Sequence, residues 1–274
     1  MNSTPKFPPG PWKLPLIGNL HQLVDSLPHD SLMNLAKKYG PLMHLQLGEV
    51  AHIVVSSPEI AKEVMKTHDT IFANRPFLIA ARILSYDCTN IGFSPYGDYW
   101  RHVRKICAMD LLSTHRVQFL RSIREEEMAN LIDALYLSES SPTNLSEKIS
   151  LLSHSITARA AFGKKSKHER EFILLSKEVS KVAAGFCVAD IYPSIKMLQL
   201  ISRLKRNLEK LHQDINRILG NIIEDHRENK MRMKTDDGKE KEDIVDVLLK
   251  LQKCSDLDQP LTDRNIKAVL LAST

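Results

Sequence analysis

A regular spacing of aliphatic residues in the second half of the chain constrains the fold more than any other feature. Leu204, Leu208, Leu211, Ile215, Ile218 and Ile222 follow one another at steps of four, three, four, three and four residues. An α-helix turns once in about 3.6 residues, so this spacing places all six side chains on one face. A helix with an unbroken apolar face has to bury it against other elements. The spacing therefore predicts a helix in a packed core.

Shorter stripes of the same kind predict further helices, and one segment predicts a β-hairpin. The stripes are Met128, Leu131, Ile132 and Leu135; Leu145, Ile149, Leu152 and Ile156; Ile244, Val247, Leu248 and Leu251; and Ile266, Val269 and Leu270. Residues 42–47 and 51–55 are predicted to be two strands joined at Gly48-Glu49, since β-branched residues gather in the second. The predicted fold class is mainly α with a small β-hairpin.

The first twenty residues have a different composition from the rest. Prolines and glycines are concentrated between Pro8 and Gly18. Proline fixes its own backbone and lacks the N–H that regular elements need. We therefore predict a stiff, extended lead-in over residues 1–20, followed by a domain over residues 21–274.

Composition excludes several classes of function. The net charge of +5 comes from 38 basic and 33 acidic residues that are mixed along the chain, so no nucleic-acid-binding surface is expected. The cysteines, at positions 88, 107, 187 and 254, do not have the spacing of a zinc site, and the eleven histidines show no paired ligand spacing. No run of eighteen apolar residues is present in the sequence, so we expect it not to span a membrane as written.

The segment that follows Pro95 and Gly97 points most directly to chemistry. These two residues break the preceding segment, and Asp98 is expected to cap a helix that runs from residue 99 towards residue 112. Trp100 and Arg104 then lie four residues apart on one face. An indole N–H and a guanidinium can together bind a carboxylate at the edge of a flat apolar ligand. The alternative is a core tryptophan beside a solvated arginine.

Two other segments are candidates for contacts with partners. Residues 72–93 fit neither helical nor strand periodicity, and long irregular loops in compact domains are commonly functional. Near Phe186, an apolar segment is turned by Pro193 and is flanked by basic residues. It is predicted either to dip into a membrane interface or to be a buried connection between helices.

Several motifs, taken in order, closely resemble plant microsomal cytochrome P-450 enzymes of the clan that oxidises terpenoids and other specialised metabolites. They are Pro8-Pro9-Gly10-Pro11 with Leu14-Pro15-Leu16-Ile17-Gly18-Asn19, Lys38-Tyr39-Gly40-Pro41, Phe72-Ala73-Asn74-Arg75-Pro76, and Tyr96-Gly97-Asp98-Tyr99-Trp100-Arg101 with Arg104-Lys105. The resemblance implies the N-terminal half of the cytochrome P-450 fold, haem b as the cofactor, and insertion of one oxygen atom from O₂ into a small apolar substrate.

The resemblance also implies roles for single residues and for partners. Trp100 and Arg104 fall on the positions that hold a haem propionate in the family. Residues 78–91 match its first substrate-recognition region, so the expected substrate contacts are Ile79, Ile83, Tyr86 and Ile91. An NADPH-dependent reductase would supply electrons, and the expected location is the cytosolic face of the endoplasmic reticulum membrane, or the cytosol if the anchor is absent.

The chain also departs from the family pattern. It covers about half of the family's length and stops where the central oxygen-activating helix should begin, and the cysteine loop that supplies the iron ligand is absent. No catalytic residue and no metal ligand is therefore assigned. Glu224 and Arg227 match the family's Glu-x-x-Arg by spacing, but we expect an exposed helix end there. The alternative function is a truncated, non-catalytic polypeptide that binds at most a membrane surface or a partner.

Overall fold

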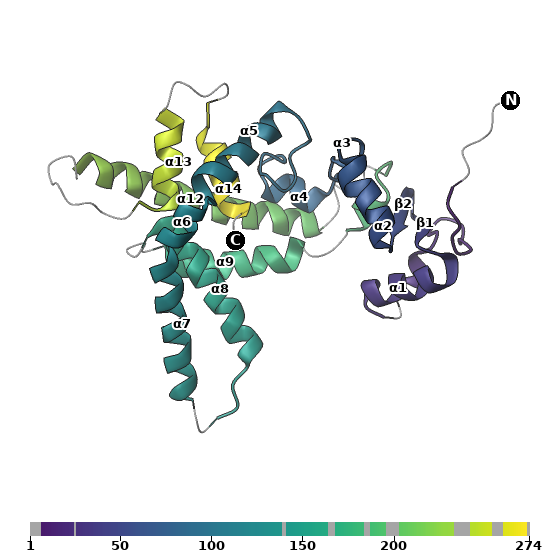
Figure 1. The fold of residues 1–274 in the computed structure, drawn as a ribbon, viewed down its shortest axis with the longest axis horizontal. Coiled ribbons are helices and arrows are strands. Elements are labelled where there is room, and N and C mark those ends of the chain that lie inside the picture. Colours follow the sequence, from purple (N-terminus) through teal and green to yellow (C-terminus); the bar gives the residue numbers. More distant parts are fainter. Residues whose placement is uncertain are drawn as a thin grey trace. The chain divides into compact units, whose positions relative to one another are not determined.

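The computed structural model describes residues 7–24, 26–138, 141–163, 168–183, 187–195, 203–232, 242–253 and 260–272. The chain divides into two compact units: residues 1–79 with 186–205, and residues 80–185 with 206–274. Figure 1 shows helices along most of the chain and one pair of short strands near its purple N-terminal end. The predicted fold class, mainly α with a small β-hairpin, is confirmed.

The first unit contains the hairpin. β1 (Leu42–Leu47) pairs antiparallel with β2 (Val50–Val55), with Leu42 opposite Val55 and Leu47 opposite Val50. Met43 and Leu45 are buried because alternate residues of a strand point to the same face. The helical segments of this unit are η1 (Leu20–Gln22), α1 (Pro28–Tyr39), α2 (Pro58–Lys62), η2 (Glu63–Thr67), α3 (Asp69–Phe72) and α10 (Val188–Ile191).

The proline-rich lead-in is fastened to β1. Leu14 and Gly18 pair as an isolated bridge, so the chain turns back between them. Gly18 has a φ of +62°, and a side chain there would meet the Gln46 carbonyl oxygen at 2.1 Å. The Asn19 amide donates to the Trp12 carbonyl at 2.9 Å, and its oxygen accepts from the Gln46 N–H at 2.8 Å. The prediction of an extended lead-in is therefore wrong beyond residue 14.

The segment around Pro193 lies against the hairpin turn. The Ile191 carbonyl accepts from the Glu49 N–H at 3.0 Å, and the Glu49 carboxylate accepts from the Ser194 N–H at 3.0 Å. Asp190 caps the start of α10 by accepting from the Cys187 N–H. Its other oxygen accepts from the Ile79 N–H at 2.8 Å. The predicted turn is confirmed, while the apolar residues around Phe186, at 184–186, and residues 196–202 lie outside the described part of the chain.

The second unit is built from helices that pack around α12. These are α4 (Ile79–Leu84), α5 (Asp98–Ile106), η3 (Cys107–Leu111), α6 (Thr114–Phe119), α7 (Arg121–Tyr136), α8 (Leu145–Phe162), α9 (Glu169–Ala183), α12 (Arg203–Arg232), α13 (Ile244–Lys253) and α14 (Asp263–Ala272). α4 and α12 each begin in the first unit. Among the described helices, none is both long and apolar enough to cross a membrane.

The stripe on α12 faces the core as predicted. Leu208, Ile215, Ile218 and Ile222 are 0–1% exposed. Leu211 packs against the hydrophobic core cluster to which the three isoleucines belong. The predicted inner faces of α13 and α14 are also confirmed, since Ile244, Val247, Leu248, Ile266, Val269 and Leu270 are all buried. The packing of three helical faces against each other accounts for most of this core.

The stripes on α7 and α8 are buried much less than predicted. Met128 is 47% and Ile132 59% exposed, and no residue of α7 is buried. On α8, Leu145 and Ile149 are about half exposed, whereas the buried residues lie near its end, at Ala158 to Phe162. Asn144 caps α8 as expected by accepting from the Glu147 N–H at 3.2 Å. The helices were predicted correctly, but the burial of the α7 stripe and of the first turns of α8 was not.

Candidate functional site

The predicted site begins at the start of α5. Gly97 is the residue before the helix, and Asp98 is its first residue rather than its cap. The Asp98 carboxylate accepts a hydrogen bond from Arg101, one turn later, instead of from a backbone N–H. The prediction that Asp98 caps the helix is therefore wrong, because the arginine is a stronger, charged donor. The helix continues through η3 to Leu111, close to the predicted end.

Trp100 and Arg104 lie on one face of α5, as their spacing predicts. The guanidinium carbon of Arg104 is 5.0 Å from the centroid of the Trp100 ring, a cation–π contact. The Trp100 indole N–H donates to the Ile91 carbonyl oxygen at 3.0 Å. The indole is thus fixed by the loop in front of α5, and its ring supports the guanidinium. In this arrangement the indole N–H is already engaged, which the sequence did not indicate.

Arg104 and its neighbour Arg101 differ in their partners. The Arg104 side chain is exposed, and within the described residues it forms no ion pair. Arg101 pairs with Asp98, and this hydrogen bond raises the pKa of its guanidinium. A guanidinium without a carboxylate partner can bind one from a ligand through two parallel N–H donors. Arg104 therefore fits an anionic group such as a haem propionate, whereas Arg101 is occupied.

The predicted substrate contacts do not share one environment. Ile79 belongs to the first unit, where it is buried, while Ile83, Tyr86 and Ile91 belong to the second. Ile83 is partly buried on α4, Tyr86 is 5% exposed within the core, and Ile91 packs against that core. Burial raises the pKa of Tyr86, so its hydroxyl stays protonated. Their contact with a substrate stays a prediction.

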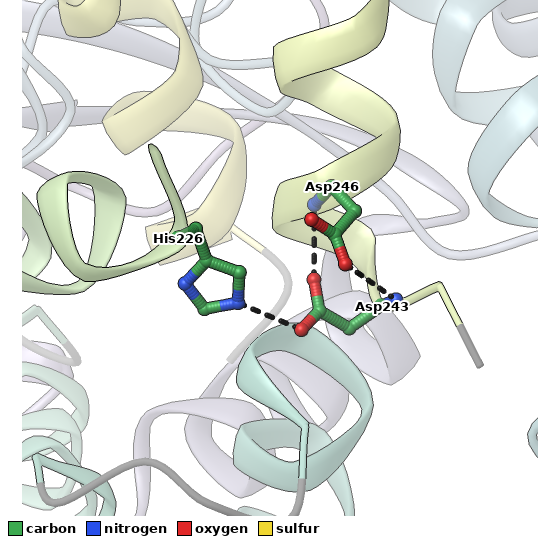
Figure 2. A group of neighbouring side chains, drawn as sticks. All are labelled: His226, Asp243 and Asp246. Carbon is green, nitrogen blue, oxygen red and sulfur yellow. Dashed lines mark hydrogen bonds and ion pairs between the residues drawn. The ribbon is translucent and has the colours of Figure 1, made fainter. Parts of the chain in front are cut away.

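One group of ionisable side chains was missed by sequence reasoning. His226 on α12 lies beside Asp243 and Asp246, which flank the start of α13 (Figure 2). Its Nδ1–H donates to the Ile222 carbonyl at 2.7 Å, and Nε2 is 2.8 Å from the Asp243 carboxylate. Burial opposes the charge on the ring, but the bond to Asp243 outweighs it and raises the pKa to about 9. His226 is therefore an imidazolium at neutral pH.

The same three residues have the ligand types of a metal site. Their ligand atoms all lie within 4.8 Å of one another. However, the Asp243 carboxylate accepts from the Asp246 N–H at 2.9 Å and so caps α13, besides binding the imidazolium. Burial, together with the charge of Asp243, raises the pKa of Asp246. The group thus serves as a polar junction between α12 and α13, which a separation of 17 residues in sequence does not reveal.

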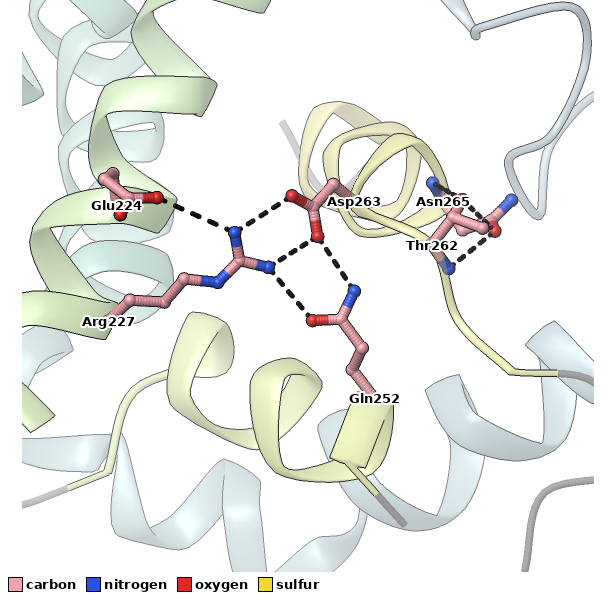
Figure 3. Close-up of polar contacts among 6 residues, drawn as sticks. All are labelled: Glu224, Arg227, Gln252, Thr262, Asp263 and Asn265. Atoms are coloured by element: carbon pink, nitrogen blue, oxygen red, sulfur yellow. Dashed lines mark hydrogen bonds and ion pairs between the residues drawn. The ribbon is translucent and has the colours of Figure 1, made fainter. Parts of the chain in front are cut away.

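The helix end expected at Glu224 and Arg227 is wrong, although the Glu224 side chain is exposed as expected. Both residues lie inside α12, which continues to Arg232. Arg227 binds both oxygens of Asp263, at 3.0 and 2.6 Å, and donates to the Gln252 amide oxygen at 3.1 Å (Figure 3). Its contact with Glu224 is longer, at 3.7 Å. Arg227 joins α12, α13 and α14, so it is a structural residue that sequence spacing alone could not place.

The described cysteines do not resemble an iron ligand. Cys88, Cys107 and Cys187 are free thiols, and Cys254 lies outside the described residues. Burial raises the pKa of Cys107 in the core and also that of Cys187. Haem-thiolate chemistry requires a deprotonated sulfur, which a low pKa favours. The raised pKa values therefore give no support for an iron ligand at Cys107 or Cys187.

Comparison with known proteins shows which family this fold belongs to. The family model "Cytochrome P450" matches residues 8–273. Cytochrome P450 71D11 of Lotus japonicus is 54% identical over 270 residues, which are 98% of this chain and 55% of that protein. Premnaspirodiene oxygenase of Hyoscyamus muticus is 48% identical and tabersonine 6,7-epoxidase isoform 1 of Catharanthus roseus 49%, over 97% and 98% of this chain and 53% of each protein.

A solved structure supports the same assignment of fold. A zebrafish cytochrome P450 with progesterone superimposes with a TM-score of 0.67 at 18% identity, over 91% of this chain and 56% of that one. The chain thus spans about half the length of the curated relatives that it matches. The predicted resemblance is confirmed both in sequence and in fold. This chain belongs to the cytochrome P450 family.

Proposed function

We propose that the chain is part of a haem-thiolate monooxygenase that inserts one oxygen atom from O₂ into a small apolar plant metabolite such as a terpenoid. Family membership and relatives named as an oxygenase and an epoxidase support this proposal. The structural observation that carries it is Arg104, an exposed guanidinium held on the Trp100 ring without an ion pair in the described residues. Members of this family bind haem, whose propionates are the carboxylates that such a residue binds.

The residues of α5 would hold haem b by its edge. Arg104 supplies two charged N–H donors to one propionate, and the Trp100 ring keeps the guanidinium oriented. The indole N–H reaches a carboxylate only after it releases the Ile91 carbonyl, to which it donates at 3.0 Å. In this proposal Arg104 is the main anchor, and Trp100 is the support that couples it to the preceding loop.

The remaining parts of the proposal concern the substrate and the partners. Ile79, Ile83, Tyr86 and Ile91 would contact the substrate, and apolar side chains suit a terpenoid because they offer it a surface free of water. Bound haem supplies the activation of O₂. An NADPH-dependent reductase supplies the electrons, and no nucleic acid is involved. The proposed location is the cytosolic face of the endoplasmic reticulum membrane, which the segment around Pro193 could contact.

A second candidate is a polypeptide without catalytic activity. The sequence favours it, since none of its four cysteines lies in the cysteine loop that supplies the iron ligand in this family. A reduced, CO-bound difference spectrum of the purified chain separates the two candidates. A thiolate-type Soret band contradicts the second candidate, whereas no band contradicts catalysis by the chain alone.

The haem anchor is tested directly by titrating the purified chain with haem and recording the absorbance. Arg104→Ala should weaken haem binding by about tenfold or more, because a charge-assisted hydrogen bond is lost. Arg101→Ala is the matched control, as it removes an arginine that already pairs with Asp98. It should change the affinity less than about twofold. Equal losses in the two variants would contradict the role of Arg104.

A further inference from the structure

The loop between α4 and α5 contains an unusual backbone turn. Tyr86, Asp87 and Cys88 have φ values of +55°, +58° and +58°. Left-handed backbone is rare for residues other than glycine, and three such residues in succession are rarer still. The turn cannot be chosen by local preference, so the surrounding contacts must impose it.

The first residue of the turn is anchored in the core. The Tyr86 ring meets the His212 ring edge-on, with their centroids 4.5 Å apart, and its hydroxyl donates to the Asn216 amide oxygen at 3.4 Å. That oxygen also accepts from the Lys267 ammonium at 2.9 Å. Because Lys267 belongs to α14, this helix orients Asn216, the residue that accepts the hydrogen bond from the Tyr86 hydroxyl.

The second residue is bound by two arginines of different origin. Arg264 of α14 donates to the Asp87 carboxylate, and Arg82 of α4 donates to its other oxygen at 3.3 Å. Arg82 lies only five residues before Asp87 and can move with the turn. Arg264 is 177 residues away and fixes the turn to another helix. The two contacts have similar exposure, but they constrain the loop differently.

A third contact from α14 holds the residue after the turn. The Asn265 amide N–H donates to the Tyr99 hydroxyl at 2.8 Å, and this hydroxyl donates to the Thr89 carbonyl at 2.7 Å. The Asn265 oxygen accepts from Thr262, as Figure 3 shows, so the amide cannot rotate without losing that bond. Two residues after Thr89, the Ile91 carbonyl receives the Trp100 N–H.

We propose that Arg264, Asn265 and Lys267 of α14 form a clasp that holds the Tyr86–Cys88 turn in its left-handed conformation. They are positioning residues: they set the backbone that carries Tyr86 and Ile91 and that fixes Trp100. The description of Tyr86 and Ile91 as substrate contacts and of Trp100 as a haem support rests on the proposed function. The clasp itself rests on the contacts alone, and releasing it opens the turn.

Cys88 provides a direct readout of the turn because it is the third left-handed residue and is partly buried. Alkylation of the purified chain, followed by peptide mass spectrometry, measures its rate separately from that of Cys107. Arg264→Gln should speed alkylation of Cys88 about threefold or more, since the tie to α14 is lost. Arg82→Gln, which removes only the local partner of Asp87, should change it less than about 1.5-fold. Arg264→Lys keeps a positive charge opposite Asp87, so its rate of Cys88 alkylation should stay close to that of the unmodified sequence.

Asn265→Ala is the second test, because it removes a different contact of the clasp and should also speed alkylation of Cys88. Equal rates in the Arg264→Gln and Arg82→Gln variants would overturn the proposal. A matching rise at the buried Cys107 would overturn it as well, because it would show general loosening of the unit. The measurement requires no haem, so a failed haem titration leaves it unaffected and the two failures can be told apart.

Discussion

The region around α12 and the pair formed by α7 and α8 use the same sequence pattern in different ways. On α12, the aliphatic stripe is covered, and Ile215 and Ile218 are completely buried. On α7, the stripe at Met128 and Ile132 stays largely exposed. α7 is instead tied to α8 through Arg159, which binds Glu126 at 2.7 Å and also binds Glu127. The stripe of α12 is thus covered by apolar packing, whereas α7, whose stripe stays exposed, has an ion-paired contact with α8.

This contrast shows what a helical stripe can predict. Its spacing indicates that a helix forms and which side is apolar, because both follow from 3.6 residues per turn. It contains no information on whether another element covers that side. The packing of α12 against α13 and α14 brings together residues far apart in the chain. Coverage is a tertiary property, so the stripes of α7 and α12 look equivalent until the fold is known.

The largest expected effect is in the core of α12. Ile218→Ala removes a completely buried side chain and leaves a cavity, so the free energy of unfolding should fall by about 3 kcal/mol. Ile149→Ala on α8, where the side chain is 50% exposed, should cost about 1 kcal/mol or less. Urea unfolding followed by circular dichroism measures both. Similar losses would show that the two regions do not differ in burial.

The second prediction concerns the charged tie between α7 and α8. Arg159→Met leaves the Glu127 carboxylate, which is 15% exposed, without its cation, so the free energy of unfolding should fall by about 2 kcal/mol. Arg121→Met is the matched control, because its pair with Glu125 is exposed on both sides. It should cost less than about 1 kcal/mol. Adding Glu127→Gln to Arg159→Met should recover part of the loss, and no recovery would argue against the buried charge as its cause.

How far the sequence predicts this molecule depends on the range of the interactions. The hairpin, the cap at Asn144 and the shared face of Trp100 and Arg104 follow from neighbours within a few residues, and all appear in the structure. The roles of Arg227 and His226 depend on partners 36 and 17 residues away, and sequence patterns did not find them. Close spacing also misled at Asp98, where a nearby arginine competes with the backbone.

A smaller effect is expected from pH at the junction of α12 and α13. The pKa of His226 is raised from 6.5 to about 9 in the folded chain, so its charge stabilises the fold fully below pH 6.5. This contribution is lost as the pH rises through 9. Between pH 6.5 and 9 the free energy of unfolding of the chain should therefore fall by about 1–2 kcal/mol more than that of a His226→Gln variant. The measurement is urea unfolding at each pH with a chelator present, and parallel pH profiles would contradict the ion pair with Asp243.

The smallest effect is expected on the exposed stripe of α7. Met128→Gln and Ile132→Gln replace side chains that are about half exposed, and glutamine is a good helix former. The free energy of unfolding should therefore change by no more than about 0.5 kcal/mol. Unfolding should be compared at two protein concentrations about tenfold apart, because a stripe covered by a second copy would make stability depend on concentration. If stability rises with concentration and Ile132→Gln removes that rise, the stripe is covered in solution and α7 resembles α12 after all. If neither variant matters at either concentration, the difference between the two helices lies in their burial alone.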